Sequence, residues 1–266
     1  IPPSITFIIY GMITGESIGD LFLSGIVPGL IFGFMLCIMV FIKSKKNGWK
    51  GDTQRASLKE IGRLFLDTIW GLLSPVIVLG GIYSGLFTPT EAAAVAVVYS
   101  LIVGIFIYKE LRLTELKETL FSTAKTTGMI LLIIMNAGIF SWVLTQQGIA
   151  ASLTEMALAL TDNRYIMLFI INIVFLCAGC VMDNTSALYI LVPIIMPIAK
   201  ALDINMIQLG VILVLNLSIG QVTPPVGPNL YVAADIGKVK FEEICRRMVP
   251  LLLMSLLALL CITYIP

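Results

Sequence analysis

The sequence predicts an all-α polytopic membrane protein that contains broken helices and a re-entrant helical hairpin. Of its 266 residues, 58% are hydrophobic and 12% are charged, and the mean hydropathy is +1.01. Apolar runs of about 18 to 22 residues recur, which is enough to span a hydrocarbon core of about 30 Å. Proline pairs interrupt the apolar pattern at Pro2-Pro3 and at Pro224-Pro225. Unpaired backbone groups are costly in hydrocarbon, so such breaks persist only where protein, water or a ligand meets the freed groups.

The composition also excludes several classes of function. The net charge is +1 and the basic residues fall in loops, so nothing indicates a nucleic-acid partner. The chain has no histidine, which excludes histidine metal sites, Ser-His-Asp triads and the zinc-protease H-E-x-x-H motif. Among the five cysteines, Cys177 and Cys180 form a C-x-x-C inside an apolar helix. We predict that they are small buried hydrophobic residues and not a redox pair.

Residues 1–43 are predicted to be the end of a first repeat, made of a half-helix and a span. Ile1 stands directly before the first proline pair, with neither an initiator methionine nor a signal peptide, so we expect the chain to be the C-terminal portion of something longer. The half-helix covers residues 4–13, a short acidic loop follows, and the span covers residues 21–42 with a kink at Pro28 and Gly29.

Residues 44–65 are predicted to be a cytoplasmic loop followed by an interfacial helix. Basic residues dominate this loop, which places it inside by the positive-inside rule. From Ala56 to Phe65 the apolar residues share one helical face, as expected for a helix that lies along the membrane surface.

Residues 66–266 are predicted to be a second repeat, which begins with scaffold helices at about 66–148. Thr88-Pro89-Thr90-Glu91 predicts a capping box at the start of a span. The expected elements are a span over 66–87, a span over 91–108, an interfacial helix over 109–125 and a span over 126–144.

The rest of this repeat is predicted to hold the site. A re-entrant hairpin at about 164–200 carries a polar tip, Asp183-Asn184-Thr185-Ser186, between two short apolar limbs. A broken helix at about 206–236 contains the second proline pair, and the last span covers about 248–266. Asn136 and Asn216 stand within spans, where hydrogen bonds between helices are the expected role.

Charge indicates that the two repeats are inverted. Placing Ile1 on Thr223 aligns the two proline pairs, Gly15 with Gly237, and Pro28 with Pro250, without a gap. The short loop after the half-helix is acidic in the first copy and basic in the second. Opposite charge on equivalent loops implies opposite orientation in the membrane, so the two breaks should face each other near the midplane.

Three motifs are similar to those of a known family. Residues 80–94, 182–186 and 215–229 resemble the large membrane subunit of tripartite ATP-independent periplasmic (TRAP) transporters, and the likeness runs from Ile1 to the C-terminus. The resemblance implies an elevator-type, inverted-repeat fold of the ion transporter superfamily in the bacterial inner membrane. It also implies sodium-coupled uptake of an organic acid, such as a sialic acid or a C4-dicarboxylate. The implied partners are a small membrane subunit and a periplasmic substrate-binding protein, besides the lipid bilayer and the organic anion itself.

The resemblance further assigns sites to the tip and the breaks. Sodium would be the only ion bound, with no other cofactor, and its predicted ligands are Asn184, Thr185, Gly220, Gln221, Thr223, Pro225 and Gly227. The predicted substrate-binding residues are Pro3, Ser4, Ser186, Pro228 and Asn229, with Pro2 beside them. The first sodium site would be incomplete, because the hairpin that completes it should precede Ile1.

The residue chemistry fits sodium, a hard cation that neutral carbonyl and hydroxyl oxygens can hold without a carboxylate. The carbonyls near Gly220, Gln221 and Thr223 are expected to be free for this role. Asp183 is the only acidic residue predicted at membrane depth, and it either caps the helix that starts at Asn184 or helps to hold sodium indirectly. Thr185 and Ser186 are either further cap residues of the same helix or part of the binding site, and two polar tips that meet two proline breaks favour the site.

Three other classes of function fit the sequence less well. An ion or anion channel needs a continuous polar path, whereas this sequence has polar breaks closed by apolar limbs. An intramembrane aspartyl protease needs two membrane aspartates, and a serine protease needs a histidine, so we expect no enzyme. A purely structural subunit would have no use for costly proline breaks.

Overall fold

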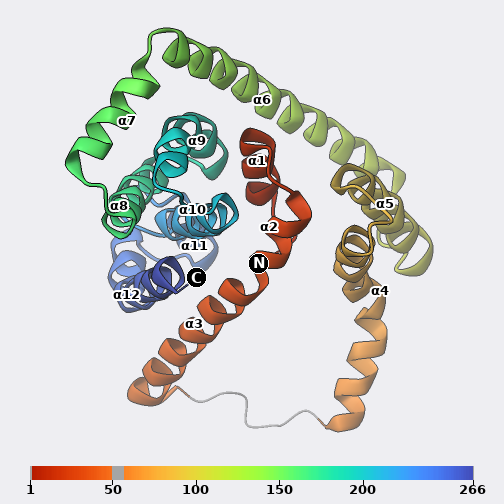
Figure 1. The fold of residues 1–266 in the computed structure, drawn as a ribbon. Helices are drawn as coiled ribbons and strands as arrows, with labels where there is room; N and C mark the ends of the chain where they lie inside the picture. The colour runs from red at the N-terminus through yellow and green to blue at the C-terminus, as the bar shows by residue number, and fades with distance from the viewer. Residues whose placement is uncertain (1, 50–56, 266) are drawn as a thin grey trace. The chain divides into compact units, whose positions relative to one another are not determined.

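The structure is a computed structural model that describes residues 2–49 and 57–265, and the regular structure within them is helical (Figure 1). Contacts between residues divide the chain into two compact units, which are described separately. The larger unit holds residues 1–47 and 133–266, and the smaller unit holds residues 48–132. The long helix α6 (Leu113–Gln146) begins in the smaller unit and ends in the larger one.

The larger unit is built around α10 (Met206–Gly220). This helix is apolar on nearly all sides, as expected for a helix that lies in a protein core or a membrane. Ten of its 15 residues are buried, and α8, α12, α1 and α2 pack against it. The other helices of the unit are α1 (Ile5–Thr14), α2 (Ile18–Ser24), α3 (Ile26–Asn47), α7 (Ile149–Leu160), α8 (Arg164–Val181), α9 (Asn184–Ala201), α11 (Pro228–Gly237) and α12 (Phe241–Tyr264).

Helices α3 and α12 pack against each other and run in opposite directions. Near the end of α3, Lys43 Nζ donates a hydrogen bond of 2.8 Å to the carbonyl of Arg247, near the start of α12. At the other end, Val27 and Pro28 of α3 line a cavity of about 580 Å³ together with Ile262 of α12. The half-helices α1 and α11, which precede these two long helices in the chain, also have the same length of 10 residues.

The break in the first long helix is at Gly25, not at the predicted kink at Pro28 and Gly29. Helix α2 ends at Ser24 and α3 begins at Ile26. A Cβ on Gly25 would lie 2.8 Å from the ring of Phe7, so a glycine is required where α1 crosses. Pro28 lies in the first turn of α3, where its missing N–H costs little.

The smaller unit contains α4 (Leu58–Tyr83), α5 (Pro89–Ile102), the π-helical turn η1 (Val103–Ile107) and the start of α6. The predicted capping box is confirmed, because Thr88 N donates to Glu91 Oε2 at 2.8 Å and Glu91 N donates to Thr88 Oγ1 at 3.3 Å. The hydroxyl of Tyr99 donates to the Trp70 carbonyl at 2.6 Å and ties α5 to α4.

Neither predicted interfacial helix is a separate element. Helix α4 runs unbroken through the expected boundary between residues 65 and 66, and α6 runs unbroken through the boundary between residues 125 and 126. Neither boundary carries a proline or glycine, so the pattern changes from amphipathic to apolar within one helix. Residues 50–56 of the predicted loop lie outside the described residues. Helix α7 was not predicted. Helix α12 begins at Phe241 and not at the predicted start of the last span near residue 248, so Arg246 and Arg247 lie within this helix.

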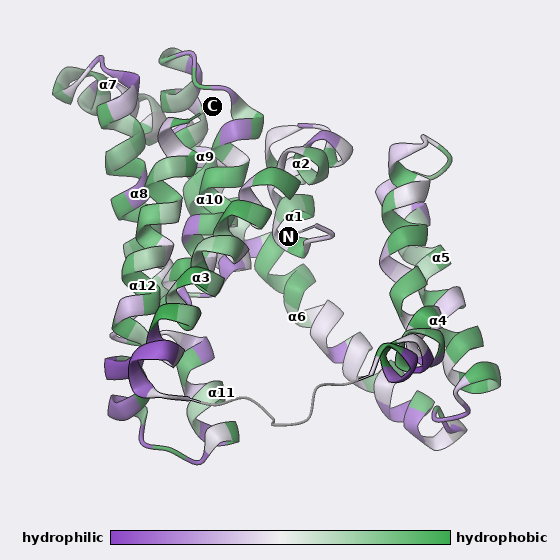
Figure 2. Ribbon diagram, turned by 90° about the horizontal axis from the view of Figure 1, so that it is seen from below, coloured by the Kyte–Doolittle hydropathy of each residue, from purple (hydrophilic) through white to green (hydrophobic). Residues whose placement is uncertain are grey.

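Among the described residues, seven helices are long and apolar enough to cross a membrane by length and composition. Figure 2 shows green, apolar residues along most of the helices and purple, hydrophilic residues mainly near their ends and in the loops. This pattern agrees with a multi-pass membrane protein. Helices α8 and α9 are among the seven, with 18 residues each, and their re-entrant course stays a prediction.

Candidate functional site

The predicted polar tip joins α8 to α9, and Asp183 caps the second of these helices. The backbone N–H of Ser186 donates to Asp183 Oδ2 at 3.0 Å, and the Ser186 hydroxyl donates to Asp183 Oδ1 at 2.6 Å. Asp183 has the extended backbone of an N-cap and is exposed to solvent. The prediction that Asp183 caps the helix starting at Asn184 is therefore confirmed, and the Ser186 hydroxyl also donates to the capping carboxylate.

Asn184, the next residue, has a different environment. Its Oδ1 atom is buried and has no hydrogen-bond partner among the described residues. A buried carbonyl oxygen without a donor costs about 1–3 kcal/mol, and a bound ion or water is one way to satisfy it. Tyr189 Oη and Asn216 Oδ1 are also buried without a partner among the described residues, but only Asn184 lies at the tip. Thr185 and Ser186 are half-buried beside it.

The second break is a compact turn between α10 and α11. Helix α10 ends at Gly220, and α11 begins at Pro228 after Gly227, whose φ of +49° favours glycine. The Thr223 hydroxyl donates to the Ile219 carbonyl at 2.7 Å. Gln221 and Thr223 are half-buried and Pro225 is exposed.

The expectation of free carbonyls is wrong for two of the three positions. The Gly220 carbonyl accepts from Thr223 N at 2.9 Å, and the Gln221 carbonyl accepts from Asn229 N at 3.2 Å. The side chains of Asn229 and Gln221 also pair, with Nδ2 donating to Oε1 at 3.0 Å. Each carbonyl keeps a second lone pair that could coordinate an ion, but the turn is closed by its own hydrogen bonds.

The structure brings the tip and the break together through two contacts. Gly227 N donates to the Cys180 carbonyl at 3.2 Å, which joins the turn to the last helical turn before the tip. Gly179 and Gly220 meet backbone to backbone, since a Cβ on Gly220 would lie 2.7 Å from the Gly179 Cα. This approach requires the missing side chain of Gly220, whereas a Cβ on Gly179 would lie 3.2 Å from the Gly220 Cα and would need a small shift. The prediction that both cysteines are buried is confirmed for Cys180 and wrong for Cys177, which is exposed, and both thiols are free.

The first break lies at the start of α1. Pro2 is buried, Pro3 is exposed, and Ser4 is the half-buried N-cap residue without a side-chain capping bond. Helix α1 packs along α9, the helix that carries the tip. The hydroxyl of Tyr10 donates to the Met206 carbonyl at 2.6 Å, which anchors α1 to the start of α10.

Two features next to the site were not predicted. The first is the contact between Gly179 and Gly220. The second is a chain of buried hydrogen bonds that joins α10, α8 and α12: Asn216 Nδ2 donates to Asn172 Oδ1 at 2.7 Å, and Asn172 Nδ2 donates to Thr263 Oγ1 at 3.0 Å. The predicted helix-to-helix role of Asn216 is confirmed. The same signal, an amide within an apolar span, could have identified Asn172.

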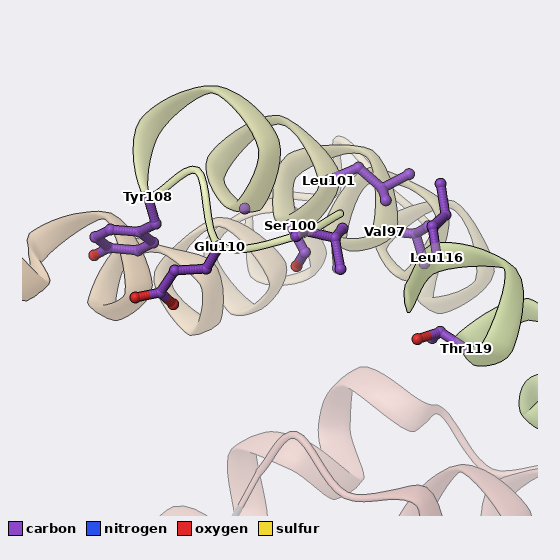
Figure 3. Close-up of a pocket in the computed structure, with 10 residues that line it drawn as sticks. Val97, Ser100, Leu101, Tyr108, Glu110, Leu116 and Thr119 are labelled. Atoms are coloured by element: carbon purple, nitrogen blue, oxygen red, sulfur yellow. The ribbon is translucent and has the colours of Figure 1, made fainter. Parts of the chain in front are cut away.

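A pocket of the smaller unit contains none of the predicted site residues. It measures about 580 Å³ and lies between α5, η1 and the start of α6. Figure 3 shows Tyr108 and Glu110 at one end of this pocket and Thr119 at the other. The lining is mostly apolar, and Glu110 is its one carboxylate among the residues shown. Across the described part of the chain, no group of three or more histidine, cysteine or acidic residues could hold a metal ion.

Comparison with known proteins gives one family. Residues 1–266 match the model of the tripartite ATP-independent periplasmic transporter, DctM component. The chain is 42% identical over 266 residues to the C4-dicarboxylate TRAP transporter large permease protein of Pseudomonas aeruginosa. It is 36% identical over 266 residues to the sialic acid TRAP transporter large permease protein of Vibrio cholerae. It is 40% identical over 266 residues to the isethionate TRAP transporter permease protein of Oleidesulfovibrio alaskensis.

These matches cover all of this chain but only part of each relative. The chain spans 62% of the Pseudomonas and Vibrio proteins and 42% of the Oleidesulfovibrio protein. The relatives are named as transport permeases, which agrees with the expectation that the chain is not an enzyme.

Proposed function

Because this chain belongs to the DctM component family of tripartite ATP-independent periplasmic transporters, we propose that it is part of a large permease subunit that couples organic-acid uptake to sodium. The hairpin tip and the second helix break together hold one sodium ion. The proposed ligands are oxygens of Asn184, Thr185, Gly220, Gln221 and Thr223, with the turn through Pro225 and Gly227 setting their positions.

The buried Oδ1 of Asn184 is the observation that carries this proposal. The atom has no hydrogen-bond partner among the described residues, and it belongs to the tip that Cys180 and Gly227 hold against the break. A cation would supply the missing partner. Asp183, whose carboxylate is engaged by Ser186, acts as a helix cap and not as a direct ligand.

Two structural features support an inverted repeat and an elevator movement. Helices α3 and α12, which are equivalent in the proposed repeat, pack antiparallel, and the half-helices α1 and α11 have equal length. The hairpin and the broken helix are joined by the glycine contact and by the buried amides of Asn172 and Asn216. These contacts favour movement of α8–α11 as one body.

The substrate would bind between the two breaks, as an organic anion in the bacterial inner membrane. The N-terminal ends of α1, α9 and α11 carry partial positive charge that suits a carboxylate. The residues proposed to contact the anion are Pro3, Ser4, Ser186, Pro228 and Asn229. Because two relatives are named for C4-dicarboxylates and sialic acid, an organic anion is the expected class of substrate. The proposed partners are a small membrane subunit and a periplasmic binding protein.

The test is uptake of a radiolabelled organic acid into proteoliposomes that contain the complete transporter, with its purified binding protein outside. We expect saturable uptake that requires an inward sodium gradient. Asn184→Ala and Thr223→Ala should each raise the half-saturating sodium concentration, by about tenfold for the loss of one ligand. Flux that continues unchanged without sodium would support a channel instead, and unaltered sodium dependence in both variants would overturn the site.

A further inference from the structure

Two basic stretches that are far apart in the sequence meet at one end of the larger unit. Lys43 near the end of α3 donates to the carbonyl of Arg247 near the start of α12, across 204 residues of sequence. Figure 2 shows hydrophilic residues at this end of α3 and in the loop between α11 and α12. We call this cluster the basic junction, and it consists of Lys43, Lys45, Lys46, Lys238, Lys240, Arg246 and Arg247.

The basic junction carries an uncompensated positive charge. Residues 43–47 and 238–247 include seven basic and two acidic residues, a net charge of +5. One of the two acidic residues, Glu243, is already paired with Arg247 at 2.7 Å. All the basic side chains except Lys43 are exposed. Like charges held together repel one another, so this end of the unit favours a bound anion.

Exposed apolar side chains adjoin the basic junction on both helices. On α3, Val40, Phe41 and Ile42 are 50%, 69% and 51% exposed. On α12, Val249 and Leu253 are 48% and 61% exposed. Both helices are long and apolar enough to span a membrane. The junction therefore stands where the apolar surface of two membrane helices ends, at the level of the lipid headgroups.

We propose that the basic junction binds the headgroup of an anionic phospholipid, whose acyl chains lie along the exposed apolar faces of α3 and α12. Orientation by the positive-inside rule would explain each basic stretch alone. That rule does not require the two stretches to lie side by side. The hydrogen bond between Lys43 and Arg247 shows that they do. A soluble polyanion would not use the adjoining apolar faces. The proposal does not rest on sodium coupling or on the identity of the substrate.

Trp49, which lies three residues after Lys46 and is 55% exposed, offers a local reporter. With Trp70 and Trp142 replaced by Phe, Trp49 is the single tryptophan of residues 1–266, and any tryptophan elsewhere in the reconstituted protein is replaced by Phe in the same way. The full protein is reconstituted with phosphatidylcholine containing a small fraction of dibrominated phosphatidylglycerol or dibrominated phosphatidylcholine. Bromine quenches nearby tryptophan fluorescence, so titration gives the preference of this site for the anionic lipid.

We expect a preference of at least fivefold for phosphatidylglycerol in the parent protein. Lys45→Gln/Lys46→Gln and Lys238→Gln/Lys240→Gln should each lower this preference about fivefold or more, although they change opposite ends of the sequence. Lys45→Arg/Lys46→Arg keeps the charge and should keep the preference. The matched control is Lys117→Gln/Lys125→Gln on α6, where both side chains are also exposed, and it should leave the preference unchanged.

Three results would overturn the proposal: no preference in the parent protein, equal preference in all variants, or loss of preference when soluble glycerol 3-phosphate is added. The last result would indicate a site for free phosphate esters. Native mass spectrometry of the detergent-solubilised protein gives an independent measurement. It should show at least one retained phosphatidylglycerol that both Lys→Gln double variants of the junction lose, and retention by both variants would contradict the assignment.

Discussion

Two neighbouring residues at the hairpin tip show how differently adjacent polar side chains can be used. Both carboxylate oxygens of Asp183 accept hydrogen bonds from Ser186. The Oδ1 of Asn184 is buried and has no partner among the described residues. A negative charge at the start of a helix is stabilised by the helix dipole and the first N–H groups, which is sufficient to explain an aspartate here. The unsatisfied amide oxygen has no such structural explanation.

This difference predicts separate effects of substitution at Asp183. Asp183→Ala should destabilise the protein by about 1 kcal/mol through loss of the cap, whereas Asp183→Ser, which can still cap, should cost less. Thermal unfolding in detergent measures both. The half-saturating sodium concentration for uptake should be the same in Asp183→Ser as in the parent protein. A rise in the serine variant equal to that in Asn184→Ala would show that the carboxylate is itself a sodium ligand.

At the scale of helices, the close contact between α8 and α10 is expected to set the geometry of the proposed site. A Cβ on Gly179 would lie 3.2 Å from both the Gly220 Cα and the Leu217 carbonyl oxygen, so Gly179→Ala must push the two helices apart slightly. The tip and the break would then separate. We expect Gly179→Ala to raise the half-saturating sodium concentration several-fold, with a stability cost of about 1–3 kcal/mol.

The matched control is Gly138→Ala in α6, because a Cβ at Gly138 meets nothing within 4 Å. This variant should retain the parent sodium dependence. If Gly179→Ala lowers protein yield but leaves the sodium midpoint in place, the contact stabilises the fold without positioning the site.

The buried amides of α8 and α10 give a second prediction at this scale. Asn172→Ala leaves Asn216 with only one of its two acceptors and removes a donor to Thr263. We expect a loss of about 1–3 kcal/mol in unfolding free energy, because buried polar groups lose their partners. Asn172→Ala/Asn216→Ala should cost less than the sum of the two single changes. Unfolding in mixed micelles would measure all three variants, and strict additivity would show that the two amides are not coupled.

At the scale of the whole molecule, the proposed inverted repeat predicts that equivalent loops lie on opposite sides of the membrane. In a variant from which every native cysteine has been removed, Asp20→Cys should react with an impermeant maleimide from outside the cell. Lys240→Cys should react only after the membrane is opened. Both positions are exposed, so access to the side chain does not decide the result. Labelling of both positions from the same side would refute the inversion.

Features that depend on neighbouring residues could be predicted from the sequence, whereas features that depend on contacts between distant helices could not. Local chemistry was predictable: the Thr88–Glu91 capping box, the Asp183 cap and the Pro224-Pro225 break each depend on a few consecutive residues. The position of the break at Gly25 was not, because it depends on the ring of Phe7 in another helix. The contact between Gly179 and Gly220 was missed for the same reason. The boundaries expected at residues 65 and 125 were wrong because a helix without a breaker continues through a change in its surface pattern.

We propose above that the hairpin tip and the second helix break hold one sodium ion together. Equilibrium binding of radioactive sodium to the purified transporter without substrate measures this directly. We predict saturable binding that Asn184→Ala weakens by about tenfold, that Gly179→Ala weakens and that Gly138→Ala leaves unchanged. Sodium binding that is equally tight in Asn184→Ala and in the parent protein would contradict the account.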